Sequence, residues 1–293
     1  MMKNNILVIG SNGQLGTDMV QLAAQQKIVC TGLDFPQIDI TSQESVAAVM
    51  ATVKPDIVIN CAAFTAVDDC ETKPGDAYKV NADGPAVLAK ATRNCGALLV
   101  HISTDYVFDG TKKTPYLETD TPSPLTVYGK SKLEGEIKIA QNTDRFQIYR
   151  IAWLYGIYGN NFVKTIRNVA AKKAASGETL KVVNDQFGTP THTVDVCRQI
   201  FSTMQKELFG IFHCTSQGAC SWYDFAREII DSYNIKADLK PCTTEEYPRP
   251  APRPMYSVLE NARLKSAGED NMPEWKEAFH AFLKRENQAE KLS

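Results

Sequence analysis

The first half of the chain alternates short apolar runs with helical stretches, and no other feature constrains the fold as strongly. Runs rich in valine and isoleucine, without polar alternation, are typical of strands buried on both faces of a parallel sheet. Helices then connect the strands, almost always right-handed, and cover both faces. The pattern predicts a doubly wound, Rossmann-type α/β fold. The expected strands are 6–10, 28–34, 56–63, 97–104 and 146–156, and the expected helices are 13–26, 41–54 and 75–96.

The second half shows a looser pattern without an internal repeat. Helices are expected at 161–176, 194–206 and 221–233, strands at 180–185 and 210–214, and a proline-rich loop at 247–259. We expect a dinucleotide-binding domain from residues 1–150, with part of about 186–215 returning to it. Residues 151–185 and 216–293 are then expected to form a smaller C-terminal substrate-binding lobe.

A glycine-rich turn, "GSNGQLG", follows the first expected strand and opens a helix. Gly10, Gly13 and Gly16 allow a tight turn, close approach of a pyrophosphate and close packing of helix on strand. The helix N-terminus then offers free N–H groups to phosphates. The spacing is G-x-x-G-x-x-G rather than the usual G-x-G-x-x-G, but the strand–turn–helix context favours dinucleotide binding.

Two further segments fit the same cofactor. Asp34 ends the second strand, where an acid can accept hydrogen bonds from the adenosine ribose, although "LDFPQ" is also a turn sequence. Small Ala62 and Ala63 follow the third strand, and would let the backbone approach a ligand or simply pack closely.

Helix 41–54 is expected to begin with a capping box of Thr41 and Glu44.

Tyr128 and Lys132 stand four apart in "YGKSK" and therefore share one face of a helix. Such a lysine can lower the pKa of the tyrosine from about 10 and make it a usable proton donor. Hydroxyls and an acid end the fourth strand in "HISTDYVFDG", while His101 is expected to be a core histidine. A Ser/Thr–Tyr–Lys arrangement beside a dinucleotide suits hydride chemistry; the alternative is an exposed aromatic beside a solvated lysine.

Composition excludes several classes of protein. The 293 residues carry a net charge of −2 with both signs mixed, so no basic stripe indicates nucleic acid or an anionic membrane surface. No apolar run approaches the length of a membrane span. The eight cysteines show no C-x-x-C pair or metal-ligand spacing, so we expect reduced thiols in a cytoplasmic protein.

Taken together, "GSNGQLG", "NCAAFTAVD", "HISTDYVFDG", "SPLTVYGKSKLEGE", "YRIAWLYG", "GNNFVKT", "NDQFGTPT" and "RPAPRP" resemble the dTDP-4-dehydrorhamnose reductases of the extended short-chain dehydrogenase/reductase superfamily, from residue 6 to about 260. The resemblance implies reduction of the C4 keto group of dTDP-4-dehydro-L-rhamnose by NADH or NADPH. It implies that Tyr128 donates the proton, that Lys132 lowers its pKa and binds the ribose, and that Thr104 hydrogen-bonds the reacting oxygen.

The resemblance also implies binding residues. Asp105 and Trp153 would contact the sugar, and Arg253 is a candidate for the diphosphate. The residues that would bind the cofactor, besides Tyr128 and Lys132, are Gly10, Ser11, Asn12, Gly13, Gln14, Leu15, Gly16, Asp34, Asp39, Ile40, Ala62, Ala63, Phe64 and Thr65.

Several alternatives stay open. Some relatives dimerise through Mg²⁺ held by glutamates; here only Asp18 matches, so no metal site is assigned, and both a monomer and a homodimer are retained. Phe64 replaces a frequent histidine with little expected effect.

A 4,6-dehydratase would need a second acid after Asp105, where Tyr106 stands. A 4-epimerase and a non-catalytic subunit, like the β subunit of methionine adenosyltransferase, remain alternatives. Asp34 predicts a preference for NADH.

Overall fold

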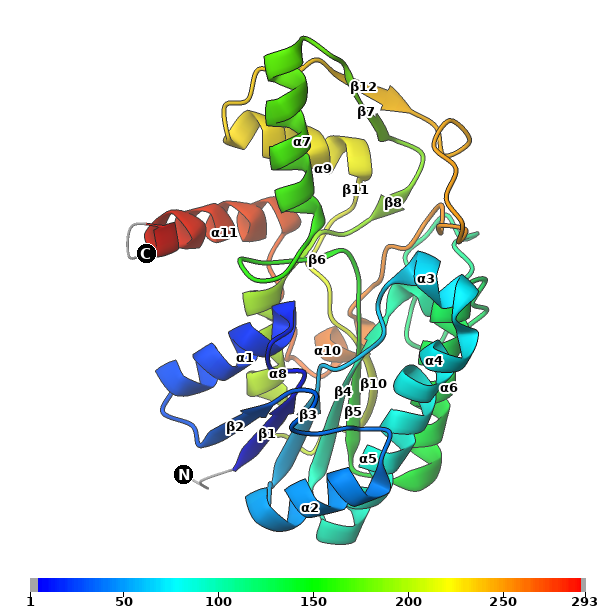
Figure 1. Cartoon of the computed structure of the whole chain (residues 1–293), viewed down its shortest axis with the longest axis vertical. Helices are drawn as coiled ribbons and strands as arrows, with labels where there is room; N and C mark the ends of the chain where they lie inside the picture. Colours follow the sequence, from blue (N-terminus) through cyan, green and yellow to red (C-terminus); the bar gives the residue numbers. More distant parts are fainter. Residues whose placement is uncertain (1–4, 291–293) are drawn as a thin grey trace.

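A six-stranded parallel sheet lies at the centre of the lower part of the protein in Figure 1. The structure is a computed structural model and describes residues 5–290. The strand order is β10-β5-β4-β3-β1-β2, so the order reverses on either side of β1. The strands are β1 (Ile6–Ile9), β2 (Cys30–Leu33), β3 (Ile57–Asn60), β4 (Leu98–Thr104), β5 (Phe146–Ile151) and β10 (Gly210–His213).

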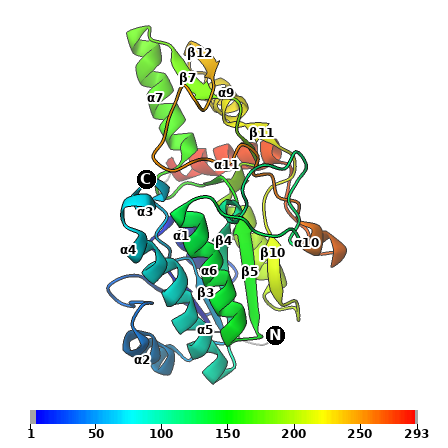
Figure 2. The same ribbon diagram turned by 90° about the vertical axis from the view of Figure 1, so that its right-hand side faces the viewer.

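Alternate residues of each strand are buried on opposite faces of the sheet. Ile6 and Val8 pack in one cluster with α1 (Gln14–Gln25) and α8 (Thr193–Thr203). Leu7 and Ile9 pack in a second cluster on the other face, with α2 (Gln43–Val53), α5 (Gly84–Cys95) and α6 (Val127–Asn142). Figure 2 shows α5 and α6 in front of the strands. Burial on both faces explains the continuous apolar runs, and the prediction of a doubly wound fold is confirmed.

Helix boundaries differ from the expected ones where side-chain caps act. Helix α2 begins after Ser42, whose hydroxyl accepts a hydrogen bond from Ser45 N, so the predicted Thr41 capping box is wrong. The Thr41 hydroxyl instead donates to Asp39 Oδ1. The expected helix 75–96 is divided into α4 (Pro74–Tyr78), a π-helical turn η1 (Lys79–Asp83) and α5, and it ends at Gly96 as predicted.

A smaller group of elements lies above the carboxyl ends of the strands in Figure 1 and has a core of its own. Helices α7 (Phe162–Ser176), α9 (Trp222–Ser232) and α11 (Trp275–Glu290) pack there with β7 (Leu180–Val183), which pairs with β12 (Leu239–Cys242). The shorter elements are α3 (Val67–Thr72), η2 (Asp105–Val107), β6 (Leu154–Tyr155), β8 (Phe187–Gly188), β9 (Thr191–His192), β11 (Cys220–Ser221) and α10 (Ala262–Ser266). The first four and last three residues of the predicted domain ranges lie outside the described chain.

Within residues 5–290, no helix is long and apolar enough to cross a membrane.

Candidate active site

A cavity of about 740 Å³ opens at the carboxyl ends of the parallel strands, beside the point where the strand order reverses. Ligands of doubly wound sheets bind at such a point. Of the residues predicted from the sequence, Ser11, Asn12, Gly16 and Phe64 do not line this cavity, and Arg253 lines a second one. Those that do line it are Gly10, Gly13, Gln14, Leu15, Asp34, Asp39, Ile40, Ala62, Ala63, Thr65, Thr104, Asp105, Tyr128, Lys132 and Trp153.

The glycine turn is packed so tightly that side chains would not fit. Gly10 has a φ of +77°, and a Cβ there would lie 2.7 Å from the backbone nitrogen of Ala62. A Cβ on Gly16 would lie 2.1 Å from the Gly10 carbonyl oxygen. Both glycines therefore allow the close approach of β1, β3 and α1 that leaves the first turn of α1 open to the cavity.

Asp34 both lines the cavity and holds the glycine turn. Its Oδ2 accepts a hydrogen bond from Asn12 N at 3.0 Å, and its Oδ1 accepts one from Phe35 N at 2.8 Å. Asp34 therefore anchors the glycine turn, and its place in the cavity is compatible with the predicted contact to a cofactor ribose. The neighbouring Phe35 is 74% exposed and lines the same cavity.

The segment after β3 is held by a residue that sequence reasoning did not identify. Asn81, in the π-helical turn η1, accepts a hydrogen bond from Phe64 N at 2.8 Å and donates to Phe64 O at 3.0 Å. Its Nδ2 also lies 3.0 Å from the Ser131 hydroxyl on α6. The Phe64 backbone is thereby paired within the protein, and α6 is tied to the cavity wall. An asparagine inside a helical stretch, where it is disfavoured, was the available signal.

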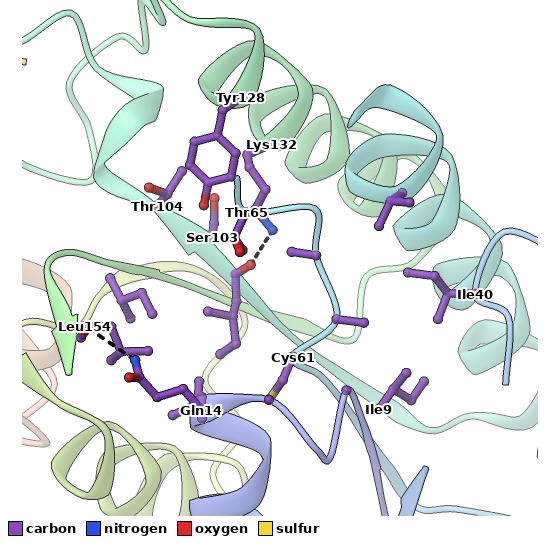
Figure 3. A pocket seen from close by; sticks show the side chains of 18 of the residues that line it. Ile9, Gln14, Ile40, Cys61, Thr65, Ser103, Thr104, Tyr128, Lys132 and Leu154 are labelled. Atoms are coloured by element: carbon purple, nitrogen blue, oxygen red, sulfur yellow. Dashed lines mark hydrogen bonds between the residues drawn. The ribbon is translucent and has the colours of Figure 1, made fainter. Parts of the chain in front are cut away.

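Tyr128 and Lys132 point from α6 into the cavity, toward the end of β4 (Figure 3). Thr126 starts this helix by accepting a hydrogen bond from Gly129 N, which places Tyr128 in the first turn. Both side chains are almost fully covered, with exposed fractions of 8% for Tyr128 and 2% for Lys132. Lys132 Nζ donates to the Ile102 carbonyl oxygen at 2.6 Å.

Burial governs the charge states of this pair. Burial raises the pKa of Tyr128 above its ordinary value, against a hydrogen bond with Thr104 that lowers it. Burial also lowers the pKa of Lys132 to about 8. The expected lowering of the Tyr128 pKa is therefore not found, because burial outweighs it. Tyr128 is a neutral phenol at pH 7, which is the form that can donate a proton.

Thr104 and Asp105 complete the polar wall opposite Tyr128. The Thr104 hydroxyl donates to Asp105 Oδ1 at 3.0 Å and accepts from Tyr106 N at 3.2 Å. Burial raises the pKa of the Asp105 carboxyl to about 6. Asp105 lines both cavities, so a ligand that spans them passes this carboxyl.

A buried ion pair supports the helix behind the cavity. Glu136 on α6 accepts hydrogen bonds from Arg150 on β5, from Nε at 3.0 Å and from Nη2 at 2.6 Å. The Ser103 hydroxyl on β4 donates to the same carboxylate. Glu136 and Arg150 are each 2% exposed, and this pairing fixes α6 against the ends of β4 and β5. Residues this far apart in sequence give no local signal for such a pair.

A second cavity, of about 510 Å³, is lined largely by the smaller group of elements and shares Asp105, Tyr106 and Trp153 with the first cavity. Trp153 (φ +47°) stacks on Trp222, with ring centroids 3.4 Å apart and planes at 6°. Arg253 lines this cavity, where its Nη2 donates to Asp68 Oδ2 at 2.9 Å, and Arg249 also lines it. Sequence reasoning missed Trp222 and Arg249, although Arg249 stands in the same proline-rich run as Arg253.

Asp18 does not fit a magnesium ligand. It is buried in α1; its Oδ2 accepts a hydrogen bond from the Thr193 hydroxyl, and its Oδ1 accepts one from Arg285 Nη2 at 2.6 Å. A guanidinium this close opposes a divalent cation, so we assign no role to Mg²⁺ at this residue. Across the described residues, no group of three or more His, Cys, Asp or Glu side chains could hold a metal.

Known proteins match this chain along nearly its whole length. The RmlD substrate binding domain family matches residues 2–288. The dTDP-4-dehydrorhamnose reductase of Burkholderia thailandensis is 38% identical over 93% of this chain and 96% of the relative. That of Clostridium acetobutylicum, a solved structure, shares 46% identity and a TM-score of 0.92 over 96% of this chain and 98% of that one. The solved enzyme of Bacillus anthracis, in complex with NADP, shares 37% identity and a TM-score of 0.92 over 97% and 100%.

These matches confirm the resemblance found in the sequence motifs, and relatives well above 30% identity are covered almost end to end. The chain belongs to the RmlD family of dTDP-4-dehydrorhamnose reductases.

Proposed function

We propose that this protein reduces the C4 keto group of dTDP-4-dehydro-L-rhamnose to give dTDP-L-rhamnose, with NADH or NADPH as the reductant. The observation that carries the proposal is the position of Tyr128, Thr104 and Asp105. Tyr128 and Thr104 line the cavity bounded by the glycine turn, and Asp105 lines both this cavity and a second one bounded by tryptophans and arginines. A dinucleotide in the first cavity and a sugar nucleotide in the second would meet at these three residues.

The protein's own residues supply the proton and the orientation. When bound, the reduced nicotinamide supplies the hydride that C4 accepts. Tyr128, a buried phenol, donates its proton to the carbonyl oxygen as that oxygen gains negative charge. The Thr104 hydroxyl lines the same cavity and can hydrogen-bond that oxygen. Lys132, as an ammonium, stabilises the phenolate left on Tyr128 and offers its remaining N–H groups to the ribose.

The second cavity has the chemistry of a nucleotide diphosphate site. Trp153 and Trp222 offer apolar faces for the sugar, while Arg249 and Arg253 bring positive charge for the diphosphate. Asp105 can accept hydrogen bonds from sugar hydroxyls above pH 6, where its carboxyl is ionised. We therefore propose that the smaller C-terminal group of elements is the substrate-binding lobe.

The direct test is oxidation of NADH in the presence of dTDP-4-dehydro-L-rhamnose generated from the upstream keto-sugar, with the product identified by NMR. Stoichiometric formation of dTDP-L-rhamnose is expected. An intact, folded protein that binds NADH but forms no product would favour a non-catalytic subunit, which a pull-down of a partner enzyme would then identify.

We propose that the reaction takes place in the cytoplasm, since all eight cysteines are free thiols, as a reducing compartment favours.

Trp153→Ala is expected to weaken the interaction with the sugar nucleotide by about 1–3 kcal/mol, because the mutant loses an indole that covers the sugar. KM for the sugar nucleotide should rise while the Kd of NADH stays unchanged. Gly188→Ala provides a matched test, since its Cβ would lie 2.3 Å from Trp153 Cε2 and displace the indole without removing it. Unchanged kinetics in both variants would assign Trp153 to core packing alone.

Asp34 is expected to favour NADH, because its carboxylate would repel the extra phosphate of NADPH. Asp34→Asn keeps an oxygen that can accept the Asn12 N–H but removes the charge, so the ratio of kcat/KM for NADPH to that for NADH should rise. Asp34→Ala should also lower kcat/KM for NADH, because the glycine turn loses its anchor. If Asp34→Asn leaves the ratio unchanged, Asp34 acts only as the turn anchor.

A further inference from the structure

A buried chain of polar side chains runs behind the cavity and ends at Lys132. Asn60, the last residue of β3, and His101 on β4 are paired in register and are both fully buried. Asn60 Nδ2 lies 3.1 Å from His101 Nδ1, and His101 Nε2 lies 3.2 Å from Lys132 Nζ. Neither Asn60 nor His101 lines the cavity, so neither can touch a cofactor or substrate there.

A backbone N–H determines which side-chain atoms in this series donate hydrogen bonds and which accept them. Ala62 N can only donate, and it donates to Asn60 Oδ1 at 3.1 Å. The Asn60 amide therefore turns its Nδ2 donor toward His101 Nδ1, which must accept. Burial, and then the charge of Lys132, hold the pKa of His101 well below its ordinary value, so the imidazole is neutral. A neutral imidazole with an accepting Nδ1 carries its proton on Nε2, and this N–H faces Lys132 Nζ.

An amine can accept that N–H, but an ammonium cannot. With Lys132 neutral, every contact in the chain joins a donor to an acceptor, including the bond from Nζ to the Ile102 carbonyl oxygen. With Lys132 charged, two arrangements are possible, and each contains a mismatch. If the proton of His101 stays on Nε2, this N–H faces the N–H groups of the ammonium. If the proton moves to Nδ1, the Nδ1–H faces the amide N–H of Asn60. These hydrogen-bonded side chains therefore destabilise the ammonium form of Lys132, relative to the neutral amine, by about the free energy of one hydrogen bond.

Other titratable groups face Lys132 from the elements around it. They are Cys61 after β3, and Tyr128 and Glu136 on α6; Glu136 is itself paired with Arg150. Negative charge on Glu136 or Cys61 opposes the loss of the lysine proton. None of these groups changes which ring nitrogen of His101 carries the proton.

We propose that Asn60 and His101 are positioning residues that make Lys132 release its proton readily, and so set the upper pH at which the reductase is active. This inference rests on the proposed function, in which Lys132 acts as an ammonium. Because the pKa of Lys132 is lowered, the active cation is present at lower pH and is lost as pH rises through about 8. The wild-type kcat should therefore decrease as the pH is raised through this value, and this decrease is the basic limb of the pH profile.

His101→Leu removes the N–H that opposes the ammonium. The basic limb of kcat should move up by about one pH unit, the equivalent of one hydrogen bond. The pH dependence of the Kd of NADH, followed by fluorescence, should move in the same direction, which reads the charge of Lys132 without turnover. A role in packing alone would lower stability or kcat at every pH and leave the limb in place.

Asn60→Asp tests the polarity itself with a variant of the same size. A carboxylate can accept both Ala62 N–H and His101 Nδ1–H, so Nε2 becomes an acceptor for the ammonium and the limb should again move up. The double variant Asn60→Asp/His101→Leu should show no further movement beyond that of His101→Leu. An equal additional movement in the double variant would mean that the new charge acts directly on Lys132, and would overturn the role of Asn60 in orienting His101.

The isosteric Asn60→Asp variant keeps the proposal testable if His101→Leu does not fold. A basic limb that stays in place in every folded variant overturns the proposal. Failure of the proposed function looks different, since the wild-type protein would then form no product at any pH.

Discussion

Tyr128→Phe is expected to bind NADH normally and to lose turnover by a factor of about 10² or more, the usual contribution of a positioned acid. The ring of the phenylalanine keeps the contacts of Tyr128, including the edge-to-face packing on Tyr106 at 5.5 Å between centroids. The phenolic hydroxyl is lost, and in the proposed reduction the proton of that hydroxyl goes to the carbonyl oxygen. The measurement is kcat under saturating substrate, with the Kd of NADH measured separately.

Tyr149→Phe is the matched control, because Tyr149 is also buried, and its hydroxyl is hydrogen-bonded to Thr203 in the core rather than facing the cavity. The control should lower stability while leaving kcat nearly unchanged. Near-normal turnover in Tyr128→Phe would remove Tyr128 from the mechanism and leave the proton donor to be sought elsewhere on the same wall.

Lys132→Met is expected to lower both turnover and cofactor affinity, because two roles are assigned to one ammonium. Loss of a hydrogen bond from a charged group weakens binding by about 1.5–3 kcal/mol, or roughly 10- to 100-fold in the Kd of NADH. Turnover should fall as well, since the phenolate left on Tyr128 loses its neighbouring cation. The two effects are separated by measuring the Kd of NADH and kcat with saturating cofactor.

Lys130→Met is the control on the same helix, since Lys130 is exposed and lines neither cavity. It should leave both quantities unchanged. A Lys132→Met variant that changes only one of them would show that the dual assignment is wrong. Thermal unfolding is measured alongside, because methionine leaves the Ile102 carbonyl oxygen and His101 without their partner.

The sheet and the cavity at the glycine turn could be predicted from local sequence patterns. Each buried strand needs apolar side chains on both faces, so Ile6 to Ile9 form an unbroken apolar run that shows its place in the sheet. The turn at Gly10 needs a residue without a Cβ, which names glycine directly. The helical period also places Tyr128 and Lys132 on one face, whatever lies opposite them.

The charge of those two side chains could not be read in this way. The side-chain nitrogen of Lys132 contacts His101 and the carbonyl oxygen of Ile102, about thirty residues earlier in the chain. Trp153 likewise meets Trp222 from another element. A sequence pattern records which residues share an element, whereas desolvation and the polarity of a hydrogen bond depend on which elements pack together. The spacing of Tyr128 and Lys132 therefore predicted a lowered tyrosine pKa, and burial in the folded protein raised it instead.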